Sequence, residues 1–241
     1  MLVKASTSLI KDLKKQKREN GSLLFLDNFK IIKDAIKAGL KPRYILVSDE
    51  SLNIWENENV YKVDRQTIEQ LSDSRTPQGV VCILDYLPHI VESPKTNFLV
   101  VDSLQDPGNV GTLIRTATAC GFEYVYLLDS VKVTNSKLVR SSVGTIFQSK
   151  IISMTKDEFC QYVKEWNLNL IMTDMEGDNI FTSRFNGLVG VVVGNEGQGV
   201  CDQIAKLCSK TVKIPMRAGV ESLNASISGA IIMYEIAQNN L

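Results

Sequence analysis

The 241-residue chain is poor in the residue types that build metal sites, disulfide frameworks and histidine-based active sites. It has five cysteines, an odd number without a Cys-x-x-Cys spacing, and a single histidine, His89. We therefore expect no metal site and no disulfide framework, and we interpret the thiols as buried and reduced. His89 follows Pro88 in a polar segment, so we interpret it as a loop residue rather than a general base.

Long apolar runs and two common nucleotide-binding motifs are also missing. No stretch reaches the roughly 18 apolar residues of a membrane helix, and residues 1–20 lack the apolar run of a signal peptide. We therefore expect a cytoplasmic protein without membrane association. Neither Gly-x-Gly-x-x-Gly nor Gly-Lys-Ser/Thr occurs at the required spacing, which argues against a nucleotide-dependent enzyme acting on a small substrate.

Charge is balanced over the chain but uneven along it. The formal net charge is zero, so the whole chain is not typical of a nucleic-acid-binding protein. Residues 1–43, however, carry eleven Lys or Arg against four Asp or Glu. This basic segment is compatible with contacts to phosphates, and equally with a solvated amphipathic helix.

The pattern of apolar residues predicts two α/β domains. A segment with two prolines and weak periodicity, residues 87–97, separates them, and we set the domains at residues 1–90 and 91–241. After the break, near-continuous apolar strands alternate with amphipathic helices. This alternation indicates a parallel sheet covered on both faces, whose ligands lie outside the carboxyl ends of the strands.

Three loops with unusual residues follow strands of this second domain: "DSLQDPGNVGTLIRTA", "VVGNEGQGV" and "IPMRAGVESLNAS". Each one alone is typical of a tight turn. Together they indicate one binding site, in which a shared ligand would satisfy the buried polar side chains of Asn109, Glu196 and Asn224. Arg115, six residues after Asn109, can face the same site and suits recognition of phosphate or ribose.

The segments "DPGNVGTLIRTATACGF", "GNEGQGV" and "IPMRAGVESLNASISGAI" resemble the three motifs of the SpoU/TrmH family of RNA 2′-O-ribose methyltransferases, in the SPOUT superfamily. The resemblance covers about residues 97–238. The first segment of the chain looks like the substrate-binding domain that often precedes this one, similar to a ribosomal protein that binds kink-turns. Asp27-Asn28 stands where many relatives have Glu-Gly.

The resemblance implies a parallel-sheet SPOUT domain with a deep trefoil knot, a bound S-adenosylmethionine, and a homodimer with the active site near the dimer interface. It also implies methyl transfer to a ribose 2′-hydroxyl. The matching functional positions are Asn109, Arg115, Glu196, Ser222 and Asn224, and the matching cofactor positions are Thr173, Gly194, Asn195, Gly197, Ile214, Met216 and Leu223.

The substrate is left more open than the reaction. Ribosomal RNA is preferred over transfer RNA, because the additional N-terminal domain looks like the type that accompanies ribosomal targets. A non-catalytic RNA-binding protein of the same fold is the remaining alternative, and the intact polar motif residues speak against it. Arg115 is expected to hold the ribose or its phosphate, since a guanidinium is protonated at neutral pH and is a poor base.

Overall fold

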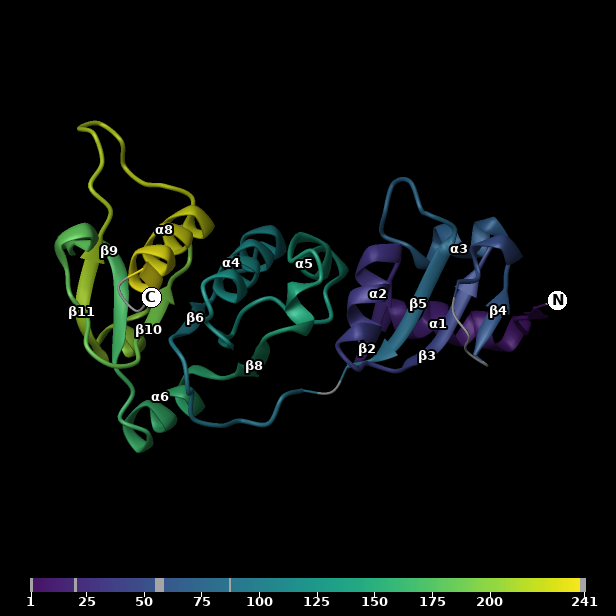
Figure 1. Cartoon of the computed structure of the whole chain (residues 1–241), viewed down its shortest axis with the longest axis horizontal. Helices are drawn as coiled ribbons and strands as arrows, with labels where there is room; N and C mark the ends of the chain where they lie inside the picture. The colour runs from purple at the N-terminus through teal and green to yellow at the C-terminus, as the bar shows by residue number, and fades with distance from the viewer. Residues whose placement is uncertain (1, 20, 55–58, 87, 239–241) are drawn as a thin grey trace. The chain divides into compact units, whose positions relative to one another are not determined.

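The computed structural model describes residues 2–19, 21–54, 59–86 and 88–238, which divide into two compact units. The first unit comprises residues 1–87 together with residues 134–147, and the second comprises residues 88–133 and 148–241. Each unit has its own β-sheet (Figure 1). Residues 134–147 are therefore far in sequence from the rest of the unit to which they belong.

The first unit is built on a mixed five-stranded sheet with the order β1-β4-β3-β5-β2. β5 runs antiparallel to β2 and β3, whereas β3 and β4 are parallel. Leu46 and Val81 lie in one core cluster, and the alternate residues Ile45 and Cys82 are equally buried, so the sheet is covered on both faces. The strands are β1 (Val3–Lys4), β2 (Leu23–Leu26), β3 (Pro42–Val47), β4 (Val60–Lys62) and β5 (Val80–Asp85).

Side-chain caps define the helices of this unit. Asn28 accepts hydrogen bonds from the backbone N–H groups of Lys30 and Ile31, at 3.0 and 3.2 Å, and so caps α2. Asp64 caps α3 by accepting a hydrogen bond from the backbone N–H of Thr67. Leu13 of α1 packs with Ile68 of α3 in the core cluster. The helices are α1 (Thr7–Glu19), α2 (Phe29–Lys37), α3 (Arg65–Leu71) and α5 (Ser136–Ser141), with short 3₁₀ turns η1 (Glu50–Leu52) and η2 (Thr145–Phe147).

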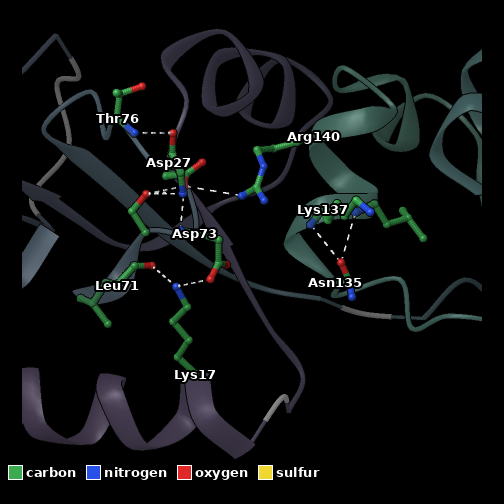
Figure 2. A network of polar contacts seen from close by, with 11 residues as sticks. Lys17, Asp27, Leu71, Asp73, Thr76, Asn135, Lys137 and Arg140 are labelled. Carbon is green, nitrogen blue, oxygen red and sulfur yellow. Dashed lines mark hydrogen bonds and ion pairs between the residues drawn. The ribbon is translucent and has the colours of Figure 1, made fainter. Parts of the chain in front are cut away.

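Asp27, at the end of β2, is a buried carboxylate that fixes the turn after α3 (Figure 2). One of its oxygens accepts hydrogen bonds from Ser72 Oγ at 2.6 Å and from the backbone N–H groups of Asp73 and Ser74 at 3.1 Å. The Asp27-Asn28 pair thus has a local structural role, because Asp27 holds a turn and Asn28 caps a helix.

The second unit contains six parallel strands in the order β11-β9-β10-β6-β7-β8. This confirms the predicted α/β architecture with a parallel sheet. The strands are β6 (Phe98–Asp102), β7 (Tyr124–Leu128), β8 (Lys150–Met154), β9 (Leu170–Asn179), β10 (Gly190–Val193) and β11 (Cys208–Lys213).

Helices cover both faces of this sheet, as the apolar strands predict. Phe159 of α6 and Ile204 of α7 share a core cluster with Tyr126 of β7. On α8, a methyl group at Gly229 would lie 2.5 Å from the end of the Leu113 side chain, so a larger residue where α8 meets α4 would require Leu113 to shift. The trefoil knot stays a prediction. The helices are α4 (Pro107–Ala119), α6 (Lys156–Glu165), α7 (Asp202–Ala205) and α8 (Ala225–Gln238), with a 3₁₀ turn η3 (Ile180–Thr182).

The cysteines are unpaired, but only Cys82 is fully buried, so their interpretation as uniformly buried thiols was wrong. Burial raises the pKa of the Cys82 thiol to about 12. Within the described residues there is no group of three or more metal-ligating side chains. No helix in that same part of the chain is long and apolar enough to cross a membrane.

Candidate active site

The candidate site lies at the carboxyl edge of the parallel sheet, because the three motif loops leave β6, β10 and β11 at that edge. A cavity of about 690 Å³ opens there, lined by residues of β9 and of the loops after β10 and β11. Its volume is in the range of ligand pockets, roughly 300–1,000 Å³. Apolar and polar side chains both line it, among them Val193, Lys213 and Arg217.

Most of the residues that the resemblance assigns to the cofactor line this cavity. Leu223 is 36% exposed, so it stands at the opening rather than in the core. Gly197 is not among the lining residues, and Thr173 lies within β9. The lining residues that were predicted are Thr173, Gly194, Asn195, Ile214, Met216 and Leu223.

Three of the predicted functional residues bond to one another, one from each loop. Asn109 Nδ2 donates to Glu196 Oε1 at 2.7 Å, and Asn224 Nδ2 donates to Asn109 Oδ1 at 3.1 Å. Glu196 and Asn224 are exposed and Asn109 is half-buried. The expectation that these side chains are buried and that a shared ligand satisfies them was therefore wrong, because two of them are exposed and all three bond to one another beside the cavity.

Asn224 also starts the last helix. Its Oδ1 accepts from the backbone N–H of Ser226 at 2.9 Å and from that of Ile227 at 3.4 Å. Ser226, which is not among the predicted functional positions, is buried and donates its hydroxyl to Asn224 at 2.6 Å. The segment "SLNAS" therefore caps α8 and also lines the cavity. The serine at its end was the feature of the sequence that could have indicated this cap.

The loop after β10 is a closed hairpin. Asn195 and Gly199 exchange two backbone hydrogen bonds of 3.0 and 2.8 Å. The Asn195 side chain braces the turn, since its Oδ1 accepts from the N–H of Gly197 at 2.9 Å and its Nδ2 donates to the Ser103 carbonyl at 3.1 Å. A methyl group at Gly194 would lie 2.3 Å from backbone atoms of Gly199, so glycine is required there by close approach.

Arg115 and Ser222 differ from the network residues. Arg115 is exposed on α4, and within the described chain we find no hydrogen bond or ion pair to its guanidinium. Ser222 is exposed and lines the cavity. Arg115 is therefore a cation whose hydrogen-bonding capacity is open to a ligand.

A buried carboxylate, that of Asp102, holds the backbone of the segment that follows the second motif loop. Asp102, at the end of β6, accepts from the backbone N–H of Cys201 at 2.7 Å and from Ser103 Oγ at 3.0 Å, and it pairs with Lys156 at 3.2 Å. Burial alone would raise the pKa of Asp102, but these hydrogen bonds and the lysine outweigh it, so the pKa is lowered. Sequence reasoning missed Asp102, although an acid closing an apolar strand was a visible signal.

Two family models match the chain over these regions. The SpoU rRNA methylase family matches residues 96–234, and the MRM3-like substrate binding domain matches residues 3–82. Among named proteins, the 23S rRNA (guanosine(2553)-2'-O)-methyltransferase of Bacillus subtilis (strain 168) is 24% identical, over 96% of this chain and 97% of the relative. The 23S rRNA (adenosine(1067)-2'-O)-methyltransferase of Streptomyces laurentii is 28% identical, over 63% of this chain and 57% of the relative.

Solved structures share the fold over the whole chain. An RNA 2'-O ribose methyltransferase superposes with a TM-score of 0.81 at 25% identity, covering 100% of this chain and 99% of that one. An AdoMet-bound rRNA methyltransferase from Sinorhizobium meliloti has a TM-score of 0.85 at 22% identity, covering 100% of this chain and 97% of that one. At that identity the second likeness shows the fold alone.

Proposed function

Because the chain belongs to the SpoU rRNA methylase family, we propose that it transfers a methyl group from S-adenosylmethionine to a ribose 2′-hydroxyl of ribosomal RNA. The observation that carries this proposal is the cavity at the carboxyl edge of the sheet, bordered by the bonded trio Asn109, Glu196 and Asn224. The names of the relatives, which act on 23S rRNA, favour ribosomal over transfer RNA.

The cavity fits the chemistry of the cofactor. An adenosyl group needs apolar contacts for its ring and a few polar groups for its edges, and the cavity offers Ile214, Met216 and Leu223 beside the backbone of Gly194. Gly197 lies outside the lining and belongs to the hairpin turn, so we give it a structural role in the proposal. The bound cofactor supplies an electrophilic methyl group on a sulfonium.

The protein's own contribution is alignment. Asn109, Glu196 and Asn224 hold the three loops at fixed spacing, which keeps the cavity mouth rigid without a ligand. Arg115 holds the ribose or its phosphate and stabilises the developing alkoxide. Ser222, exposed at the cavity, contacts the reacting end of the substrate. These assignments extend the resemblance residue by residue.

We assign RNA recognition to residues 1–90 and catalysis to residues 91–241. Structured RNA is recognised largely through phosphates and 2′-hydroxyls, to which exposed cations contribute. The first unit offers such cations on its helices, strands and loops. They are Lys4, Lys11, Lys15, Arg18, Lys30, Lys33, Lys37, Lys41 and Arg43.

A homodimer in the cytoplasm completes the proposal. On α8, Ile227 and Tyr234 are 49% and 50% exposed, although the opposite face of the helix buries Met233 and Ile236. An exposed apolar face on a core helix is typical of a protein–protein contact. Dimerisation through α8 would cover it, and size-exclusion chromatography with light scattering measures the expected dimer mass.

Incubation of the purified protein with labelled S-adenosylmethionine and either ribosomal or transfer RNA tests the reaction. We expect label in ribosomal RNA, recovered as alkali-resistant 2′-O-methylated dinucleotides. Label confined to transfer RNA would overturn the choice of substrate. Binding of S-adenosylhomocysteine without transfer to either RNA would instead favour the non-catalytic alternative.

A further inference from the structure

The connection between β7 and β8 is unusual for a parallel sheet. Such a connection normally carries a helix that packs on the same sheet. Here its helix α5 contacts β2, and η2 contacts α2, all within the first unit. The chain therefore passes from one unit to the other three times, between residues 87 and 88, 133 and 134, and 147 and 148.

An ion pair holds α5 in the first unit (Figure 2). Arg140 Nη1 lies 3.7 Å from Asp27 Oδ2, and the Asp27 side chain is 5% exposed. Arg140 Nη1 is itself buried and has no hydrogen-bond partner among the described residues. The Arg140 side chain is 33% exposed, so water reaches it only in part, and the loss of either charge removes the ion-pair partner of the other residue.

A second, independent contact lies at the other end of the segment. Gly144 has φ of +82°, and a Cβ there would lie 2.8 Å from Asp34 Oδ2 and 3.1 Å from Asp34 Cβ, on α2. Val143 before it has φ of 53°, which is costly for a β-branched residue and persists only where its surroundings fix it. The turn is thus shaped to bring the backbone close to α2.

Asp27 links this segment to the rest of the unit. The carboxylate that faces Arg140 also holds the backbone of Asp73 and Ser74. From α1, Lys17 Nζ donates to the Leu71 carbonyl at 2.6 Å and pairs with Asp73 at 3.0 Å. Helices α1 and α5, the end of β2 and the turn after α3 therefore form one polar network (Figure 2).

We propose that residues 134–147 complete the substrate-recognition unit, and that Asp27 and Arg140 are positioning residues for RNA methylation. The recognition unit is then discontinuous, and its second piece is continuous in the chain with β7 and β8 of the catalytic sheet. Through these additional chain crossings the RNA-binding unit is connected to the catalytic sheet at more than one point of the chain. The inference rests on the proposed function, in which the first unit binds RNA.

The test uses the whole 241-residue chain and the variants Asp27→Asn, Arg140→Gln and the double variant. We expect hydrogen exchange of residues 136–147 to become faster in each of them. We also expect the KM for ribosomal RNA to rise by on the order of 10-fold to 100-fold, with kcat at saturating RNA and affinity for S-adenosylhomocysteine unchanged. The double variant should lose no more than the stronger single variant, because the two residues act together.

Matched controls separate this role from general effects of charge and strain. Lys33→Gln removes an exposed cation of the same unit and should leave exchange of residues 136–147 unchanged. Arg140→Lys should recover part of the lost KM. Gly144→Ala should loosen the segment, whereas Gly39→Ala, at φ of +92° with no atom within 4 Å of the added methyl group, should not.

Two outcomes would overturn the inference. If Asp27→Asn left exchange of residues 136–147 and the KM unchanged while Arg140→Gln raised the KM, Arg140 would contact RNA directly. Additive losses in the double variant would also exclude a shared role. The exchange measurement needs no substrate, so faster exchange in a protein that methylates no RNA would refute the proposed function and leave the docked segment standing.

Discussion

Each unit contains a polar network that joins three or more segments of chain, and the two networks differ in exposure. In the second unit Asn109, Glu196 and Asn224 meet beside a cavity, and two of the three side chains are exposed. In the first unit Asp27 is 6% exposed and its carboxylate is surrounded by protein donors. The same kind of side chain is accessible to a ligand in one place and committed to the fold in the other.

This difference shows why polar residues at strand ends are not sufficient to identify a site. A buried carboxylate must be satisfied within the protein, and its loss affects stability. An exposed network already has water as a partner, so its members can exchange partners with a ligand at low cost. The following predictions separate these roles, from the largest expected effect to the smallest.

Arg115→Ala tests the active site most severely. Loss of a group that stabilises developing charge typically costs about 10²–10³ in rate. Because Arg115 is exposed, we expect this loss in kcat without a change in stability or in affinity for S-adenosylhomocysteine, measured by calorimetry. Lys164→Ala, which removes an exposed cation from α6, is the control. Normal methylation by Arg115→Ala would remove this residue from the mechanism.

Asp27→Ala and Glu196→Ala compare the buried network of the first unit with the exposed network of the second. Asp27→Ala leaves three donors without an acceptor, so we expect the free energy of unfolding to fall by about 3 kcal/mol. Glu196→Ala, at an exposed position, should change stability by less than about 0.5 kcal/mol and lower methyl transfer. Urea denaturation and the transfer assay measure both. Equal stability losses would show that the two networks do not differ in kind.

Much of this arrangement could be predicted from local pattern. The apolar strands and the caps Asn28 and Asp64 follow from side-chain periodicity and capping chemistry, and the family inferred from three motifs is confirmed by the match over residues 96–234. The sequence also predicted that the three loops converge on a single site. This expectation has a physical basis, because the carboxyl ends of parallel strands lie at one edge of the sheet.

Contacts between residues that are distant in the chain could not be predicted from the sequence. The pattern around Arg140 indicates a short helix. Nothing in the local sequence indicates that this helix packs with β2 of the first unit, although the strands before and after it in the chain, β7 and β8, belong to the second unit. Likewise, the sequence around Asp102 indicates only the end of a strand. The hydrogen bond from Cys201 and the ion pair with Lys156 become visible only in the fold. Long-range pairing of buried charges depends on topology, which periodicity does not determine.

Asn224→Ala and Asn28→Ala compare two helix caps, one in each unit. Each asparagine accepts from two backbone N–H groups, so each substitution should cost about 1 kcal/mol of stability. Only Asn224 also borders the cavity, so only Asn224→Ala should weaken both S-adenosylhomocysteine binding and methyl transfer. If both variants retained full activity and cofactor affinity, the third loop would have no part in the site.

The smallest expected effect is the pH dependence that Asp102 confers. Its carboxyl has a folded-state pKa below the ordinary value of 3.8, since the Cys201 and Ser103 hydrogen bonds and Lys156 outweigh the effect of burial. A carboxyl with a depressed pKa stabilises the fold fully above its unfolded pKa and loses this contribution as pH falls through the folded pKa. The stability difference between wild type and Asp102→Asn should therefore be constant between about pH 7 and pH 5, and shrink below about pH 4. Urea denaturation across this range measures it, and a difference that stayed constant to pH 3 would mean that Asp102 acts through its shape and hydrogen bonds rather than its charge.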